Sequence, residues 1–274
     1  MSSKSKRPSQ LNRARRNFLG LAASTGAKAA AMGVLASSIL PGHAWARRGG
    51  GRPGGGRPGG GPRCFLQGTS ISTPDGEVRV EELRVGDMVK TVRGESMPIR
   101  WIGHQTFKRF GPTWNSDVLP IRIARHALDE NTPRADLYVS PYHSLYVDGV
   151  LIQAKDLVNG STIAPALPAG HEAVDYYHIL LDSHEVVLAE GAPAETFRIE
   201  AANHEVFVNF AEVDKVIPMA AVTVMAPFAP IVRNRGRDHL KALLRSAVLP
   251  FAKAHDPIGD AQERFAARAQ ALAA

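Results

Sequence analysis

The sequence has 274 residues, a formal net charge of +7 and one cysteine, and a single thiol excludes an intramolecular disulfide. The excess positive charge lies at the N-terminus, because residues 1–63 contain 12 of the 33 basic side chains and none of the 26 acidic ones. Residues 64–274 therefore carry 21 basic and 26 acidic side chains, a formal charge of −5. We accordingly expect no broad basic face on this part of the chain and no nucleic-acid partner.

Residues 1–46 have the composition of an export signal. Arg15-Arg16 precede a mildly apolar, Ala- and Gly-rich segment at 18–40, and Ala44-Trp45-Ala46 forms a small-x-small cleavage site. The two arginines followed by x-Phe-Leu resemble a twin-arginine export signal, although Ala14 stands where serine or threonine is usual. This resemblance implies the twin-arginine translocase and signal peptidase as partners. It also implies a periplasmic or extracellular location for cargo that is exported already folded.

Two other interpretations of residues 18–40 remain open: a retained transmembrane anchor and an amphipathic surface helix. The segment has about the length of 20 residues that a span needs. However, Lys28 in its middle and the many alanines and glycines would make a weak span. We favour a signal peptide, and whether it is cleaved or retained stays open.

Residues 47–63 consist mainly of glycine, arginine and proline. Such a tract has little apolar surface to bury and cannot offset the entropy of ordering itself. It therefore predicts a disordered tether. A solvated spacer is the simplest role for it, with contact to an anionic surface as the alternative.

From Cys64 to about Phe210, short runs rich in Val, Ile, Leu and Thr are separated by Gly, Asp, Asn and Pro. These runs predict strands at 70–73, 88–91, 99–103, 118–123, 137–140, 144–147, 150–154, 177–181, 185–189 and 205–209. Asp148-Gly149 predicts a two-residue hairpin turn and Pro74-Asp75-Gly76 another turn. Many strands without long helices between them favour an all-β domain, which we place at 64–215, over a parallel α/β sheet.

Residues 216–274 predict a C-terminal extension that is partly helical. Apolar residues recur at helical spacing from Leu240 to Val248, and an alanine-rich helix is expected at about 260–272. The proline-punctuated stretch 216–230 predicts an extended segment between the β domain and these helices. We expect the helices to pack against the β domain.

The residues after Cys64 and two later segments together form a recognisable series. The first block contains Cys64, Gly68-Thr69, Ile71, Thr73, Asp75-Gly76, Glu81 or Glu82 with Leu83, Gly86-Asp87 and Val89. Ser140-Pro141-Tyr142-His143 and the segment 177–186 follow in order. Over about residues 64–200 this series resembles the Hint (hedgehog/intein) superfamily, closest to a bacterial branch of short Hint proteins. The resemblance implies an all-β, horseshoe-like Hint fold with a short C-terminal helical extension.

The resemblance also implies chemistry on the chain's own backbone. The Cys64 thiol would attack the carbonyl of Arg63 and exchange the amide for a thioester, since the thiolate is the nucleophile. His143 would give a proton to the leaving Cys64 nitrogen, and Ser140 would hold the amide or the ring. Asp182 or His184 would accept the thiol proton.

Each of these residues also has an ordinary interpretation. A lone cysteine often serves as a small buried apolar residue. His143, His178 and His184 could be core histidines with satisfied hydrogen bonds, and Asp182 or Ser140 could simply help form a turn. The position of Cys64 at the start of the folded sequence favours the nucleophile over the packing role.

Protein splicing is not expected, because inteins end in His-Asn followed by a nucleophilic residue. Here residues 190–197 contain no such pair, and Asn203-His204 has the reverse order. The sequence therefore predicts an exported protein that processes itself once at the Arg63–Cys64 bond, if it is active at all. Its substrate would be its own N-terminal segment, and the acyl acceptor could be water, an amine or an alcohol.

Two other function classes stay open. One is a catalytically silent, secreted Hint-like binding module, and the other is an exported metal-dependent hydrolase. No His-x-x-x-His, Cys-x-x-Cys or phosphate-loop pattern occurs, so we predict neither a metal site nor a cofactor.

Overall fold

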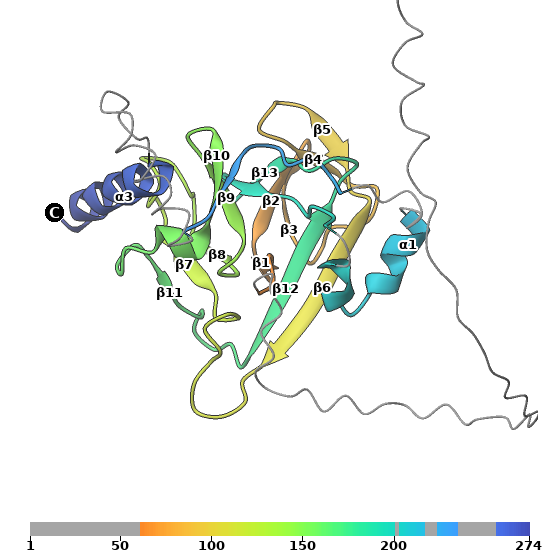
Figure 1. Ribbon diagram of the computed structural model, residues 1–274, viewed down its shortest axis with the longest axis horizontal. Helices are drawn as coiled ribbons and strands as arrows, with labels where there is room; N and C mark the ends of the chain where they lie inside the picture. The colour runs from red at the N-terminus through yellow and green to blue at the C-terminus, as the bar shows by residue number, and fades with distance from the viewer. Residues whose placement is uncertain (1–60, 201–202, 217–223, 235–255) are drawn as a thin grey trace, which may run out of the picture. The chain divides into compact units, whose positions relative to one another are not determined.

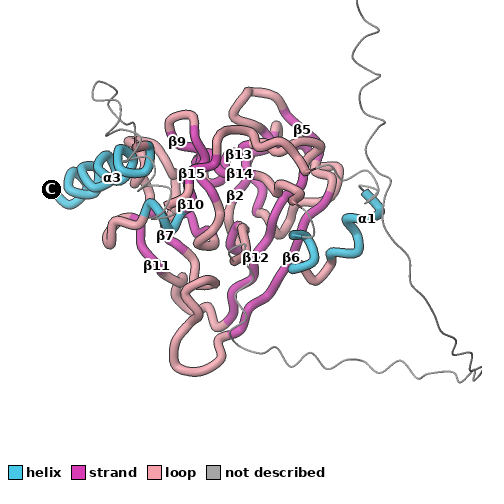
Figure 2. Tube along the Cα trace, in the orientation of Figure 1, coloured by secondary structure: helices cyan, strands magenta, loops and turns pink. Residues whose placement is uncertain are grey.

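The computed structural model describes residues 61–200, 203–216, 224–234 and 256–274, all within the unit Gly54–Ala274. These residues form three antiparallel or mixed sheets (Figures 1 and 2). The six-stranded sheet has the spatial order β11 (Ile163–Pro165), β7 (Ile121–Ile123), β8 (Leu137–Val139), β1 (Phe65–Leu66), β12 (Ala173–Leu180) and β6 (Trp101–Lys108). The seven-stranded sheet has the order β15 (Ile231–Val232), β10 (Val150–Gln153), β9 (Ser144–Val147), β14 (Ala192–Glu195), β13 (Val186–Ala189), β2 (Ser70–Thr73) and β3 (Gly76–Arg79). Strands β4 (Met88–Lys90) and β5 (Ser96–Pro98) pair separately.

The predicted all-β class is confirmed. Helical structure in the described residues is limited to short 3-10 turns η1 (Ala154–Leu157), η2 (Asn203–Val206) and η3 (Phe210–Glu212), the short helix α1 (Val213–Val216), and the C-terminal α3 (Pro257–Ala273). The predicted hairpin turn is present between β9 and β10, where Asp148 and Gly149 have φ of 48° and 87°. Nine of the ten predicted strands have a counterpart at the same place, with shifted ends.

The tenth predicted strand, at 205–209, is wrong. This segment forms η2 and a turn, in which the Phe207 N–H donates to the carbonyl of His204 at 3.1 Å. It meets the edge of β6 through the Asn209 side chain, whose Nδ2 donates to the Ile102 carbonyl and whose Oδ1 accepts from the His104 N–H. An amide side chain thus replaces most of the backbone ladder that a further strand would have made.

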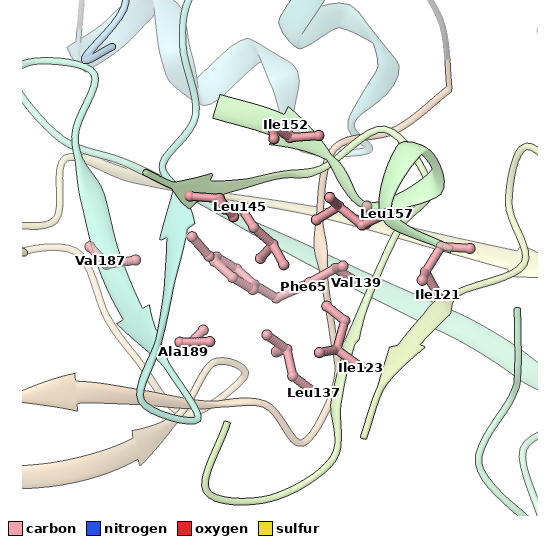
Figure 3. Close-up of a cluster of buried hydrophobic side chains, with 14 of the residues drawn as sticks. Phe65, Ile121, Ile123, Leu137, Val139, Leu145, Ile152, Leu157, Val187 and Ala189 are labelled. Carbon is pink, nitrogen blue, oxygen red and sulfur yellow. The ribbon is translucent and has the colours of Figure 1, made fainter. Parts of the chain in front are cut away.

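The alternation of side chains along β1 and the residue before it divides the core into two apolar clusters, one on each face of the strand. Phe65 is buried in the larger apolar cluster, where Figure 3 shows it beside Leu145 and Val139. Cys64 and Leu66 point to the opposite face and belong to a second cluster. Because successive side chains of a strand point to opposite faces, this division follows from the β conformation alone.

The predicted C-terminal helix is confirmed as α3, which begins at Pro257, a residue well suited to the first turn. Its Ile258, Ala261 and Phe265 are buried in the larger cluster of the β domain. Arg268 also donates to the His126 carbonyl at 3.0 Å. The helix therefore packs on the β domain as expected. The predicted helix at 240–248 lies outside the described residues.

Replacing Phe265 with alanine is expected to lower the free energy of unfolding by about 3–5 kcal/mol, the usual cost of removing a buried aromatic side chain. Urea unfolding followed by tryptophan fluorescence would measure it. Leu272→Ala on the same helix is the control, since Leu272 is largely exposed. A loss for Phe265→Ala no larger than for the control would mean that α3 contributes little to the core.

Of the residues that the structure describes, no helix is both long and apolar enough to cross a membrane.

Candidate functional site

Ser140 holds the peptide bond between Arg63 and Cys64. The Cys64 N–H donates to Ser140 Oγ at 2.7 Å, and this hydroxyl donates to the Pro62 carbonyl at 2.6 Å. The Ser140 N–H donates to the Cys64 carbonyl at 2.9 Å, which continues the pairing of β1 with β8 by one residue. One side chain thus fixes the amide on both sides of Arg63.

The Cys64 thiol is completely buried, in the second apolar cluster beside Leu66 and Tyr176. Burial raises the pKa of the thiol well above 9.0, and the backbone of Arg63 offsets this only in part. The sulfur is therefore a neutral thiol at physiological pH. Any attack on the preceding carbonyl requires a base to remove its proton.

His178 lies across β1 from Ser140. Phe65 pairs with Val139 on β8 and with Tyr177 on β12, and the same register places Cys64 between Ser140 and His178. Directly opposite residues of antiparallel strands share a face. The three side chains therefore form one row across the sheet.

His143 is fully buried beside this row. Its ring centroid lies 4.4 Å from that of Phe65 and 5.2 Å from that of His178. Neither ring nitrogen of His143 has a hydrogen-bond partner among the described residues, and the same holds for Nε2 of His178. Buried polar atoms without partners are costly, so their clustering at one peptide bond indicates a functional constraint.

Both imidazoles are neutral at physiological pH. Burial lowers the pKa of His143 from 6.5 to about 4, and Glu195 and the Arg63 backbone oppose this shift. Burial also lowers the pKa of His178 well below 6.5, and the neighbouring His143 and Arg63 lower it further. Neutral imidazoles can accept a proton from the thiol.

His184 and Glu195 form a buried pair behind His143. His184 Nε2 lies 3.5 Å from Glu195 Oε2, and His184 Nδ1 accepts from the Phe228 N–H at 3.0 Å. Glu195 Oε1 accepts from the N–H of Ser144, the residue after His143, at 2.8 Å. Burial alone would raise the pKa of Glu195, but the hydrogen bond with the His184 side chain and the neighbouring His143 and Arg63 lower it overall. The site therefore contains a buried carboxylate.

Sequence reasoning did not single out Glu195, although it lies within the segment compared with the intein terminus. The available signal was a carboxylate at the end of the short apolar run 192–194, in a strand that pairs with the buried strand β13. A charge in such a strand needs a partner, and His184 was the nearest candidate.

Asp182, in contrast, is not brought to the site. It follows the buried Leu181, so its side chain turns to the surface, where it is 59 % exposed and pairs with Arg100 at 3.1 Å. Ser140 binds the Cys64 amide, and His143 packs on the neighbouring Phe65. His184 pairs with Glu195, which binds the N–H of Ser144 next to His143. The proposed acceptor role for Asp182 has no support from its position.

No group of three or more His, Cys, Asp or Glu side chains that could hold a metal ion occurs in the described part of the chain.

The buried histidines predict a loss of stability in acid. Because the pKa of His143 and of His178 lies below 6.5 in the folded state, the unfolded chain binds more protons as the pH falls below that value. The contribution of these neutral imidazoles to the free energy of unfolding is then fully present above about pH 7 and is lost as the pH falls toward 4. Urea unfolding should show about 2 kcal/mol less stability at pH 5 than at pH 7 from His143 alone, with a further loss in the same direction from His178. Equal stability at the two pH values would contradict neutral, buried imidazoles.

The family model described as "Hint domain" matches residues 63–201 of the 274. A search of curated protein sequences finds no match.

Among solved structures, the MchDnaB-1 intein is 13% identical, with a TM-score of 0.34, and the match covers 47% of this chain and 98% of that one. The bacterial intein-like domain from Clostridium thermocellum is 15% identical, with a TM-score of 0.36 and coverage of 50% and 99%. The gp41-1 intein is 11% identical, with a TM-score of 0.33 and coverage of 48% and 96%. On the match over residues 63–201, the chain belongs to the Hint domain family.

Proposed function

We propose that this protein is an exported, self-processing Hint domain that acts once on its own Arg63–Cys64 bond. The observation that carries the proposal is the arrangement around that bond: Ser140 holds the amide nitrogen, and two buried, neutral imidazoles lie beside it. In a catalytically silent module, the same three buried ring nitrogens would lower stability by lacking hydrogen bonds, with no function to offset that cost.

In the first step, the imidazole pair accepts the proton of the Cys64 thiol. The thiolate sulfur then forms a bond to the carbonyl carbon of Arg63, and the bond from that carbon to the Cys64 nitrogen breaks. His143 delivers the proton to the departing nitrogen. Its ring lies close enough to this peptide bond for the Arg63 backbone to raise its pKa. The products are a thioester on Cys64 and a free amine, so atoms and protons balance.

Ser140 has a positioning role in this step. Its hydroxyl is already engaged with the Cys64 N–H and the Pro62 carbonyl, so the amide nitrogen cannot rotate away from the site. Holding reacting groups in place contributes a large part of the rate in intramolecular reactions.

Glu195 supplies the charge that the proton transfer needs. An imidazolium forms transiently in a buried environment, and a nearby carboxylate favours that charged form. Glu195 raises the pKa of His143 in the folded protein. It is held ionised by His184 and by the Ser144 N–H.

The second step is attack on the thioester by water, an amine or an alcohol, which releases the segment upstream of Cys64 and restores the thiol. Cyclisation by Asn203 is not part of the proposal. Its Nδ2 donates to the Arg198 carbonyl at 2.8 Å and its Oδ1 accepts from the Glu200 N–H at 3.0 Å. This side chain holds a turn and is not free to attack.

Export by the twin-arginine route is part of the proposal and rests on residues 15–46. The reaction has to wait until after transport, because cleavage at Arg63 in the cytoplasm would separate the signal from its cargo. Signal peptidase would then leave residues 47–63 as the transferable segment. Immunoblots of cell fractions with a C-terminal epitope would test the order, and Cys64-dependent shortening confined to the cytoplasm would contradict it.

The central experiment is intact mass measurement of the purified protein with and without hydroxylamine or dithiothreitol. Either reagent should open the thioester and release a species that begins at Cys64. Cys64→Ala should remain intact under the same conditions. Absence of any reagent-dependent cleavage in the unmodified protein would leave a silent Hint-like module as the better description.

A further inference from the structure

We propose that the surface formed by Tyr142, Asp117, Ser140 and Glu200 is a recognition site for the residues before Cys64. It would select glycine at position 61 and a basic side chain at position 63. The inference rests on the proposed function, because it specifies which acyl segment the reaction accepts. Apart from Ser140, which also positions the amide, it concerns residues that the proposed reaction steps do not use.

Gly61 packs against the backbone of Asp117 and the ring of Tyr142. A Cβ at this position would lie 2.6 Å from the carbonyl oxygen of Asp117 and 2.9 Å from two ring carbons of Tyr142. The ring is held in place because Tyr142 Oη donates to Asp117 Oδ1 at 2.7 Å and Lys155 Nζ lies 4.3 Å from the ring centroid. Because the closest atom is a backbone oxygen of Asp117, it cannot move aside for a methyl group as a flexible side chain could.

Arg63 is held by a charge partner. Its guanidinium lies 3.8 Å from Glu200 Oε2, while the other oxygen of Glu200 pairs with Arg198. The Arg63 side chain is only 15 % exposed, so its charge needs a partner close by. Asn203 fixes this partner, since its side chain binds the backbone of both Arg198 and Glu200.

These contacts hold the acyl segment at three successive residues. Gly61 is fixed by shape, the Pro62 carbonyl by the Ser140 hydroxyl, and Arg63 by Glu200. The segment Ser140–His143 thus contributes Ser140 to the amide, Tyr142 to recognition and His143 to proton transfer. An acidic side chain at position 63 would repel Glu200, which attracts Arg63, and the neighbouring Arg198 would offset only part of that repulsion.

Cleavage rates measured with hydroxylamine would test the selectivity. Gly61→Ala and Arg63→Gln should each slow release by at least about tenfold, because small displacements at a reacting centre have large effects on rate. Arg63→Glu should be slower still, and Arg63→Lys should stay close to the unmodified protein. Arg109→Gln is the matched control, since Arg109 is exposed and takes no part in the contacts described above for Gly61, Pro62 and Arg63. Unchanged rates for Gly61→Ala and Arg63→Gln would overturn the inference.

A second measurement does not depend on the reaction. In Cys64→Ala, trypsin can cut after Arg63 only when that side chain leaves Glu200, so this bond should be protected. Glu200→Gln in the same background should speed the cut by about five- to tenfold, whereas Glu205→Gln on the exposed face of η2 should not. Equal digestion of the two would contradict a recognition site even if cleavage by Cys64 occurs. Protection without any cleavage by Cys64 would retain the site and remove the proposed function.

Discussion

Replacing His143 with phenylalanine is expected to slow release of the segment upstream of Cys64 by about 10³-fold, within the range that a general acid–base residue contributes. The same change should not lower the melting temperature. Neither nitrogen of His143 makes a well-aligned hydrogen bond among the described residues, so the replacement gives up only the polar contact with the Arg63 backbone. The new ring can still pack on Phe65, which lies 4.4 Å away between centroids. Loss of rate without loss of stability would identify a catalytic role.

Release with hydroxylamine, followed by mass spectrometry, and thermal unfolding of the same samples would measure the two effects. Asp182→Asn is the control, because the structure places Asp182 at the surface with Arg100. It should change neither rate nor stability by much. If His143→Phe cleaved as fast as the unmodified protein, the imidazole pair would have no part in proton transfer. If it unfolded, His143 would be a core residue.

Much of this site could be predicted from the sequence because the information was local. The lone Cys64 marks the point where a Gly/Arg/Pro-rich tract gives way to strand-forming runs. Ser140 and His143 are three residues apart in a segment that follows a clear strand, and both reach the same amide. The hairpin at Asp148-Gly149 likewise depends on two adjacent residues that tolerate positive φ.

What the sequence did not reveal depends on long-range register. His178 is placed beside Cys64 only by the pairing of β12 with β1, residues more than a hundred positions apart. Asp182 and His184 were equivalent candidates for the thiol base in the sequence, but their side chains lie in different places although they are only two positions apart. Asp182 passes to the surface after β12, whereas His184 enters the core and meets Glu195. Local spacing cannot distinguish these outcomes, since the turn between the strands sets them.

The burial of the thiol also could not be read from the sequence. Cys64 heads a strand next to a polar tether, a position that favoured the nucleophile over the packing role, and its side chain is fully buried among apolar neighbours. The raised thiol pKa that follows keeps the nucleophile protonated. Under the proposed function, a resting state of this kind would suit a precursor that has to survive until after export. It also means that the reaction depends on the charge balance around the imidazoles.

That dependence makes Glu195→Gln the second informative change. The amide is the same size and its oxygen can still accept from the Ser144 N–H, so the backbone after His143 should stay in place. The lost negative charge lowers the pKa of His143 further and disfavours the imidazolium intermediate. We expect release to slow by about 10- to 100-fold, the size of one to two pKa units of lost stabilisation.

Three measurements separate this electrostatic effect from a purely structural one. NMR titration of the imidazole should place the pKa of His143 lower in Glu195→Gln than in the unmodified protein. Glu195→Asp, which keeps the charge, should recover part of the rate. Glu185→Gln is the matched control, because this carboxylate is also buried but binds Ser183 and Arg93 on the other side of β13. If the control slowed release as much as Glu195→Gln, general loss of packing would explain both. If Glu195→Gln left the rate unchanged, the proton would move without help from the buried carboxylate, and the imidazoles alone would have to stabilise the charge.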